Sequence, residues 1–209
     1  MKIPARYRWH AAALLGALSA QAIGGVVTVN VATASGATPQ DTVIMFDPLD
    51  ATPPADHGAM VIDQLNKRFV PRVSVVRTGT AITFPNSDRI RHQVYSFSPA
   101  KTFSLKLYAG SPKTPVIFDQ PGLVVLGCNI HDSMVAFVGV VDSPYFAKTT
   151  DSGIASLNVP AGRYRMRAWH PNSIAAIPSR EITVAAAPLS ITLGIDVDAA
   201  APSVAAWPE

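Results

Sequence analysis

The sequence has very little cysteine. Cys128 is the only one among 209 residues, so the chain cannot form an internal disulfide. One cysteine also excludes a binuclear copper centre, which needs two thiolates, and it disfavours structural zinc, which normally takes four Cys or His ligands. The five histidines include no His-x-His pair, which excludes the paired-histidine sites of multicopper oxidases and copper nitrite reductases.

Convincing helical periodicity is also missing after the N-terminus. Short apolar runs are separated by Gly, Pro, Asn, Asp and Ser, which is typical of a β-sandwich. The sequence therefore predicts an all-β fold, with a turn at Thr78-Gly79-Thr80 and a linker over residues 47–54. Strands are expected over residues 26–31, 43–46, 73–76, 81–84, 103–108, 116–118, 123–126, 135–141, 155–159, 164–169 and 182–193.

No apolar run is long enough to span a bilayer. Three basic residues precede a short apolar stretch over residues 11–18, and Ala20-Gln21-Ala22 fits a cleavage site. Residues 1–22 are therefore predicted to be a signal peptide, which gives a soluble periplasmic protein without a membrane span. In an oxidising compartment an unpaired cysteine is at risk unless it is buried or bound to a metal.

The excess of positive charge in the whole chain disappears once the signal peptide is removed. The signal holds three of the 17 basic residues, which leaves 14 basic against 14 acidic residues. The high isoelectric point is therefore no indication of nucleic-acid binding. The remaining charge is uneven, since residues 67–113 hold nine Lys or Arg and a single Asp. That segment either faces an acidic partner or is a solvated surface.

What the chain does contain is a cluster of metal-binding residue types. Cys128 is followed by His131 and Met134, and a thiolate, an imidazole and a thioether on one short loop suit copper. A second imidazole is available from His92, which follows a polar turn and opens a new apolar stretch. Together the four residues match the ligand types of a mononuclear blue copper site. A Cys–His nucleophile pair is the enzyme alternative, and it lacks a recognisable signature.

The order of these motifs resembles the cupredoxins. Phe84-Pro85-Asn86, His92-Gln93-Val94 and the C-x-x-H-x-x-M loop over residues 127–134 are similar to that family, the short loop most of all to amicyanin. Phe69-Val70-Pro71 resembles a strand pattern of the fold, and the likeness covers residues 61–142. The pattern also resembles exported proteins of the methylamine-utilisation type.

The resemblance implies a Greek-key sandwich with one type 1 copper. It implies His92 and His131 as imidazole ligands, Cys128 as the thiolate and Met134 as the axial thioether. It also implies that the backbone N–H of Gln93 points at the cysteine sulfur. His131 is then the ring nearest the surface and the expected electron port, although Asp132 and Ser133 replace the family's apolar neighbours.

A second module is expected after the cupredoxin-like one. Residues 150–153 and 159–164 resemble the carboxypeptidase-regulatory-like, or transthyretin-like, β domain. The predicted division is residues 23–56 as N-terminal strands and linker, 57–142 as the cupredoxin domain, 143–197 as the second β domain and 198–209 as a disordered tail. Residues 24–50 either join the second domain, with the cupredoxin inserted, or extend the cupredoxin sheets.

These observations predict a non-enzymatic, monomeric type 1 copper protein that passes single electrons between redox protein partners. The alternatives are a periplasmic protein that stores or delivers copper and a metal-free structural β module. His57 and Met60 are interpreted as part of a solvated loop, and His170 as a structural histidine.

Overall fold

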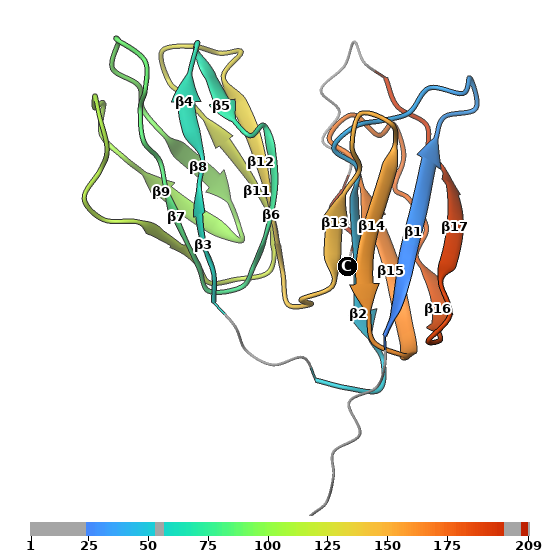
Figure 1. Cartoon of the computed structure of the whole chain (residues 1–209). Coiled ribbons are helices and arrows are strands. Elements are labelled where there is room, and N and C mark those ends of the chain that lie inside the picture. Colours follow the sequence, from blue (N-terminus) through green and yellow to red (C-terminus); the bar gives the residue numbers. More distant parts are fainter. Residues whose placement is uncertain (1–23, 53–56, 199–205, 209) are drawn as a thin grey trace, which may run out of the picture.

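The computed structural model describes residues 24–52, 57–198 and 206–208, and the predicted signal peptide lies outside them. Every regular element within these ranges is a β-strand, which confirms the all-β prediction (Figure 1). The strands form two sandwiches, named here the inserted sandwich and the flanking sandwich. No helix in the described part of the chain is long and apolar enough to cross a membrane.

The inserted sandwich contains β3 (Ala59–Val61), β4 (Asp63–Leu65), β5 (Arg68–Val70), β6 (Val73–Arg77), β7 (Thr80–Thr83), β8 (Tyr95–Ser98), β9 (Lys101–Ser104), β10 (Val116–Phe118), β11 (Gly122–Gly127) and β12 (Val135–Val141). One sheet has the order β6-β12-β11-β8-β9 and the other β10-β7-β3, while β4 and β5 form a separate hairpin.

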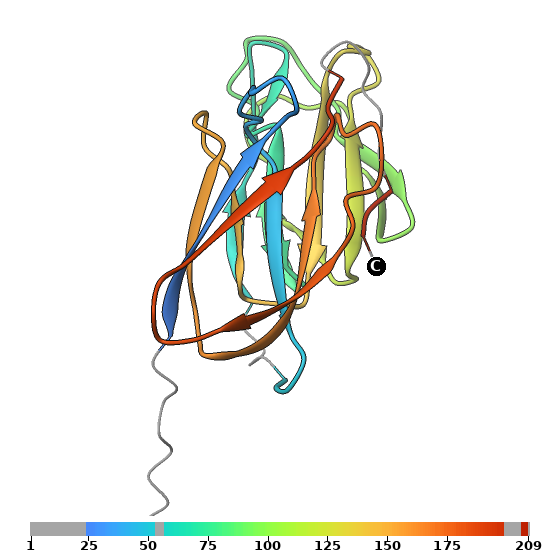
Figure 2. The ribbon, with the colours of Figure 1, turned by 90° about the vertical axis from the view of Figure 1, so that its right-hand side faces the viewer.

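The flanking sandwich contains β1 (Gly25–Ala32), β2 (Val43–Pro48), β13 (Phe146–Lys148), β14 (Ile154–Val159), β15 (Gly162–Trp169), β16 (Arg180–Val184) and β17 (Leu189–Gly194). Its sheets have the orders β14-β1-β17 and β13-β2-β15-β16. Strand β1 pairs antiparallel with β14 and parallel with β17, and β2 pairs with β15, as Figure 2 shows for β1 and β17. The strands that precede residue 50 thus pair with strands that follow residue 145, and the inserted sandwich lies between them in sequence.

Alternating side chains build the two cores. In β1, Val27, Val29 and Val31 are at most 2% exposed, while the residues between them face outward. Burying each valine is worth about 1.5–3 kcal/mol relative to leaving it in water. Strand β12 differs because it is buried on both faces, which explains its uninterrupted apolar sequence.

The second face of β12 packs against the flanking sandwich. Phe137 lies 5.6 Å from the Trp169 ring of β15, and Trp169 lies 5.5 Å from Trp207, measured between ring centroids. The Arg72 guanidinium lies over the Phe137 ring, 5.4 Å from its centroid. Trp207 sits over Gly139, where a Cβ atom would lie only 2.2 Å from the indole. A continuous apolar interface therefore joins the sandwiches.

The structure corrects four of the expectations drawn from the sequence. The strand expected over residues 103–108 ends at Ser104, and the one over 182–193 is two strands separated by a turn. Residues 47 and 48, assigned to a linker, belong to β2. The tail is not disordered at Trp207 and Pro208, since Trp207 packs on Trp169 and the Pro208 carbonyl accepts a hydrogen bond from Arg167. The turn at Thr78-Gly79 is confirmed, with Gly79 at φ +90°.

Candidate metal centre

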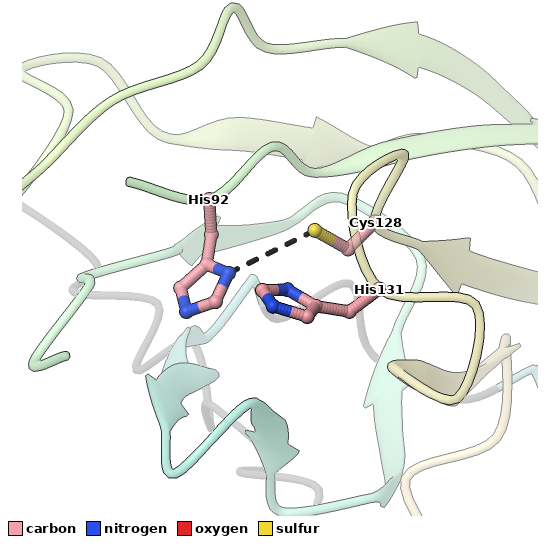
Figure 3. A group of neighbouring side chains, drawn as sticks. All are labelled: His92, Cys128 and His131. Atoms are coloured by element: carbon pink, nitrogen blue, oxygen red, sulfur yellow. Dashed lines mark hydrogen bonds between the residues drawn. The ribbon is translucent and has the colours of Figure 1, made fainter. Parts of the chain in front are cut away.

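Three of the predicted ligands meet at one end of the inserted sandwich. The ligand atoms that His92, Cys128 and His131 offer all lie within 4.8 Å of one another (Figure 3). His92 comes from the segment before β8, whereas Cys128 and His131 come from the loop between β11 and β12. Residues 36 positions apart in sequence are thus neighbours in space.

The β11–β12 loop has a compact form. Cys128 follows directly on Gly127, the last residue of β11, and it is 4% exposed. The Met134 N–H donates to the His131 carbonyl at 2.9 Å, which closes the loop before β12 begins. Met134 is 1% exposed and belongs to the same core cluster as Cys128. Its thioether is therefore held in the apolar interior beneath the loop.

His92 is held by its backbone and by its ring. Its N–H and carbonyl form a two-way bridge with Tyr108, with N···O distances of 3.0 and 2.9 Å. Its Nε2 lies 2.7 Å from the Asp88 carboxylate, and its Nδ1 faces Cys128 Sγ at 3.8 Å. Because a carboxylate only accepts, Nε2 carries the proton in the neutral ring and Nδ1 is left with a free lone pair.

Asp88 is itself fixed by a turn that the sequence did not point out. Asn66 and Lys67 both have positive φ, 54° and 57°, in the β4–β5 turn, which aims their N–H groups at the Asp88 carboxylate at 2.7 and 2.9 Å. The Lys67 N–H, followed by the His92 ring, holds the pKa of Asp88 below its ordinary value against the opposing effect of burial. The sequence feature that could have marked Asp88 is that it is the single acidic residue in residues 67–113, which hold nine Lys or Arg.

Neighbouring polar groups stiffen the His92 segment further. The buried Asn86 side chain donates to the carbonyls of Ile90 and Tyr108, both at 2.9 Å. The Tyr108 hydroxyl donates to the Phe84 carbonyl, and burial raises the pKa of Tyr108 to about 12. The segment that carries the first histidine is thus tied to Tyr108 and, through it, to Phe84 just after β7.

The donor set fits a metal ion. His131 Nδ1 is buried and has no hydrogen-bond partner in the structure, so an imidazole lone pair or N–H is left unsatisfied. Such an orphaned group is costly unless a ligand completes it. Two donors about 2.0 and 2.3 Å from one metal, at an angle of about 110–125°, lie about 3.6–3.8 Å apart. The 3.8 Å separation of His92 Nδ1 and Cys128 Sγ agrees with this spacing. Together with Met134, the cluster resembles a type 1 copper site.

The other histidines lie elsewhere. His57 is exposed, and its Nδ1 contacts the Thr78 carbonyl at 3.0 Å, on the turn where Thr78 pairs with Asp142. His170 is 8% exposed within the flanking sandwich, where its ring bridges Gln40 and Asn172. Burial lowers the pKa of His170. The Gln93 side chain donates to Ser104, and the contact of its backbone N–H with the sulfur stays a prediction.

Comparison with known proteins gives partial likenesses. The chain matches no protein-family model and no curated protein. Among solved structures it is similar to a copper-containing nitrite reductase from Thermus scotoductus SA-01, at 22% identity and TM-score 0.37 over 39% of this chain and 22% of that chain. It is also similar to a purple cupredoxin from Nitrosopumilus maritimus, at 21% identity and TM-score 0.35 over 40% and 99%. An oxidized mutant of amicyanin matches at 20% identity and TM-score 0.37 over 47% and 98%. The chain thus spans about a fifth of the nitrite reductase.

Proposed function

We propose that this protein is an exported mononuclear type 1 copper protein that transfers single electrons between redox partners. The observation that carries the proposal is the convergence of His92, Cys128 and His131, with His131 Nδ1 buried and unpartnered. Met134 completes the set as the axial ligand, and the inserted sandwich is a cupredoxin domain. Export rests on the N-terminal sequence pattern, and a monomer is proposed with it.

The proposed residues have separate tasks. The bound copper supplies a one-electron couple. His92 is oriented by Asp88 and closed off from solvent, since it is 0% exposed. His131 is only half-buried, so its ring is the route between the centre and the surface. The rigid strand ends on both sides of the site limit rearrangement of the ligands, which favours fast electron exchange over chemistry on a substrate.

The test is reconstitution of residues 23–209 with Cu(II). We expect an intense blue thiolate-to-copper absorption and a narrow hyperfine splitting in the EPR spectrum. Cys128→Ser removes the thiolate and is expected to abolish the colour, whereas His57→Ala, at an exposed histidine bonded to Thr78, is expected to keep it. A colourless wild-type protein would sink the proposal.

Copper storage or delivery is the competing function for the same ligands. A shuttle retains its metal through both oxidation states, whereas a carrier releases Cu(I) to a recipient. Reversible voltammetry without copper loss supports the shuttle. Rapid transfer of Cu(I) to a weak chelator supports the carrier.

A further inference from the structure

The end of the inserted sandwich that holds the candidate metal centre is built from three neighbouring segments. They are the β4–β5 turn, the segment before His92 and the β11–β12 loop, which lie together at the top of this sandwich in Figure 1. Asp88 joins the first two through its contacts with Lys67 and His92. A cavity of about 570 Å³ lies between the β4–β5 turn and the segment before His92, and residues of both line it. A second cavity is lined by Arg68 from the β4–β5 hairpin and by Ser133 from the β11–β12 loop.

Apolar side chains are exposed on this end. Ile130 is 49% exposed and directly precedes His131, and Ile90 is 42% exposed two residues before His92. Isolated exposed isoleucines are common, but these two precede the two candidate ligands whose ring centroids lie 5.0 Å apart. They offer a small dry contact where a partner's redox centre can approach the His131 ring.

Four positive side chains lie on two of the segments that form this end. Lys67 and Arg68 lie on the β4–β5 hairpin, and Arg89 and Arg91 lie on either side of Ile90. All four side chains are exposed, and none forms an ion pair with any described residue. An unpaired surface cation keeps its full attraction for an incoming anion, which is the property that steers association.

Three nearby carboxylates offset part of this charge, but the four cations still outnumber them. Asp88 accepts from two backbone N–H groups and from His92. Asp63 accepts from the backbone N–H groups of Gln64 and Ser87 and from the Ser87 hydroxyl. Asp132 is the exposed acidic residue of the β11–β12 loop.

The charge of the whole protein is divided between its two sandwiches. Residues 57–142 hold nine Lys or Arg and five Asp or Glu, whereas residues 24–52 and 143–198 together hold five and seven. The inserted sandwich is therefore positive and the flanking sandwich negative. This asymmetry orients the metal end toward a negative surface during approach.

We propose that Lys67, Arg68, Arg89 and Arg91, around Ile90 and Ile130, form the docking surface for an acidic redox protein. This inference rests on the proposed function, because it takes His131 as the electron port. A polar, charged rim around a small apolar centre is the usual anatomy of a protein interface. It suits a partner with carboxylates surrounding its own redox centre.

The test uses the copper-loaded protein and two probes of opposite charge. Stopped-flow spectroscopy measures reduction of the Cu(II) form by reduced cytochrome b5, a small acidic haem protein. It also measures oxidation of the Cu(I) form by the cation tris(phenanthroline)cobalt(III). Arg68→Gln combined with Arg89→Gln is expected to slow the first reaction about tenfold at low ionic strength and to leave the second equal or faster. The difference is expected to fall below about twofold at about 0.5 M salt, where charges are screened.

The matched control is Arg165→Gln combined with Arg180→Gln. These two arginines are exposed on β15 and β16 of the flanking sandwich, so the control changes the net charge equally at a distance from the metal end. We expect its rates to stay within about twofold of wild type. Equal slowing by both double variants would overturn the proposal, because only net charge would then matter. A second outcome would overturn the docking proposal in favour of a membrane surface. In that outcome the wild type binds phosphatidylglycerol vesicles in a salt-sensitive way, and the Arg68/Arg89 variant loses this binding while its rates with cytochrome b5 are unchanged. A wild-type protein without blue colour would instead show that the proposed function itself is wrong.

Discussion

Asp88→Asn separates the role of the carboxylate from the role of the ligands. In the wild type, Asp88 accepts the His92 Nε2 proton at 2.7 Å, which leaves Nδ1 free to face Cys128 Sγ. The asparagine amide keeps one accepting oxygen, and we expect the Asn66 N–H, at 2.7 Å from Oδ1, to retain it. The NH₂ group then faces two donors, the Lys67 N–H and His92 Nε2–H. We expect the ring to relieve this conflict by moving its proton to Nδ1, the atom that would bind the proposed copper.

The expected cost follows from that tautomer change. Loss of an outer partner of a ligating histidine usually lowers metal affinity about 10–100-fold, or about 1.4–2.8 kcal/mol. The metal-free protein also loses a charge-assisted acceptor for the Lys67 N–H, which we expect to destabilise it by about 1–3 kcal/mol. Competition against a copper chelator measures the first quantity, and urea unfolding of the metal-free protein measures the second.

Asp63→Asn is the matched control. Asp63 also accepts backbone and hydroxyl hydrogen bonds beside the same hairpin, from Gln64 and Ser87, but it touches no candidate ligand. We expect this variant to lose stability and to keep its copper affinity. If Asp88→Asn bound copper within about twofold of wild type, the carboxylate would not set the His92 tautomer.

Two further predictions concern the flanking sandwich and the interface. Because burial lowers the pKa of His170 and its Nδ1 accepts the Asn172 N–H, the folded state favours the neutral ring. Its contribution to stability is therefore full above pH about 6.5, the unfolded pKa, and is lost as the pH falls from there through the lowered pKa of the folded state; urea midpoints from pH 7.5 to 5 should fall less steeply for His170→Gln, and parallel profiles would contradict this. Gly139→Ala places a methyl group 2.2 Å from the Trp207 ring, so we expect displacement of that indole, a red-shifted tryptophan fluorescence and a loss of about 1–3 kcal/mol. Gly194→Ala, where the added Cβ meets no atom within 4 Å, serves as the control, and an unchanged Gly139→Ala spectrum would argue against the contact.

Much of the fold and the site was predictable because strong local signals carried them. β-branched runs predicted the longer strands, and the rare residue types around Cys128 predicted which side chains converge. The three-residue strands β3, β4 and β13 carry too few side chains for a periodic pattern, so they were missed, and only the family resemblance of Phe69-Val70-Pro71 pointed to β5. The Ala/Pro-rich composition of the tail led to the prediction of disorder, and a single packed residue, Trp207, was too weak a sequence signal to change it.

The role of Asp88 depends on a contact that composition does not encode. Its carboxylate reaches His92 because two residues in a distant turn take left-handed backbone conformations and hold it there. Asn66 tolerates such a conformation and is a common turn residue, but Lys67 is not. The pairing of a turn with a loop 20 residues away is a tertiary property, so it appears only when the chain is folded.

The pairing of β1 with β17 also has a consequence for how the chain acquires its structure. Val27 pairs with Leu189, so the first described strand must wait for the last one before its sheet is complete. The contacts of the inserted sandwich join residues much closer together, as when β11 pairs with β12. Long-range pairings form slowly because the chain entropy of a large loop is lost before they form. The inserted sandwich is therefore expected to reach its final form first, and pulse-labelling hydrogen exchange should find β11 and β12 protected before β1.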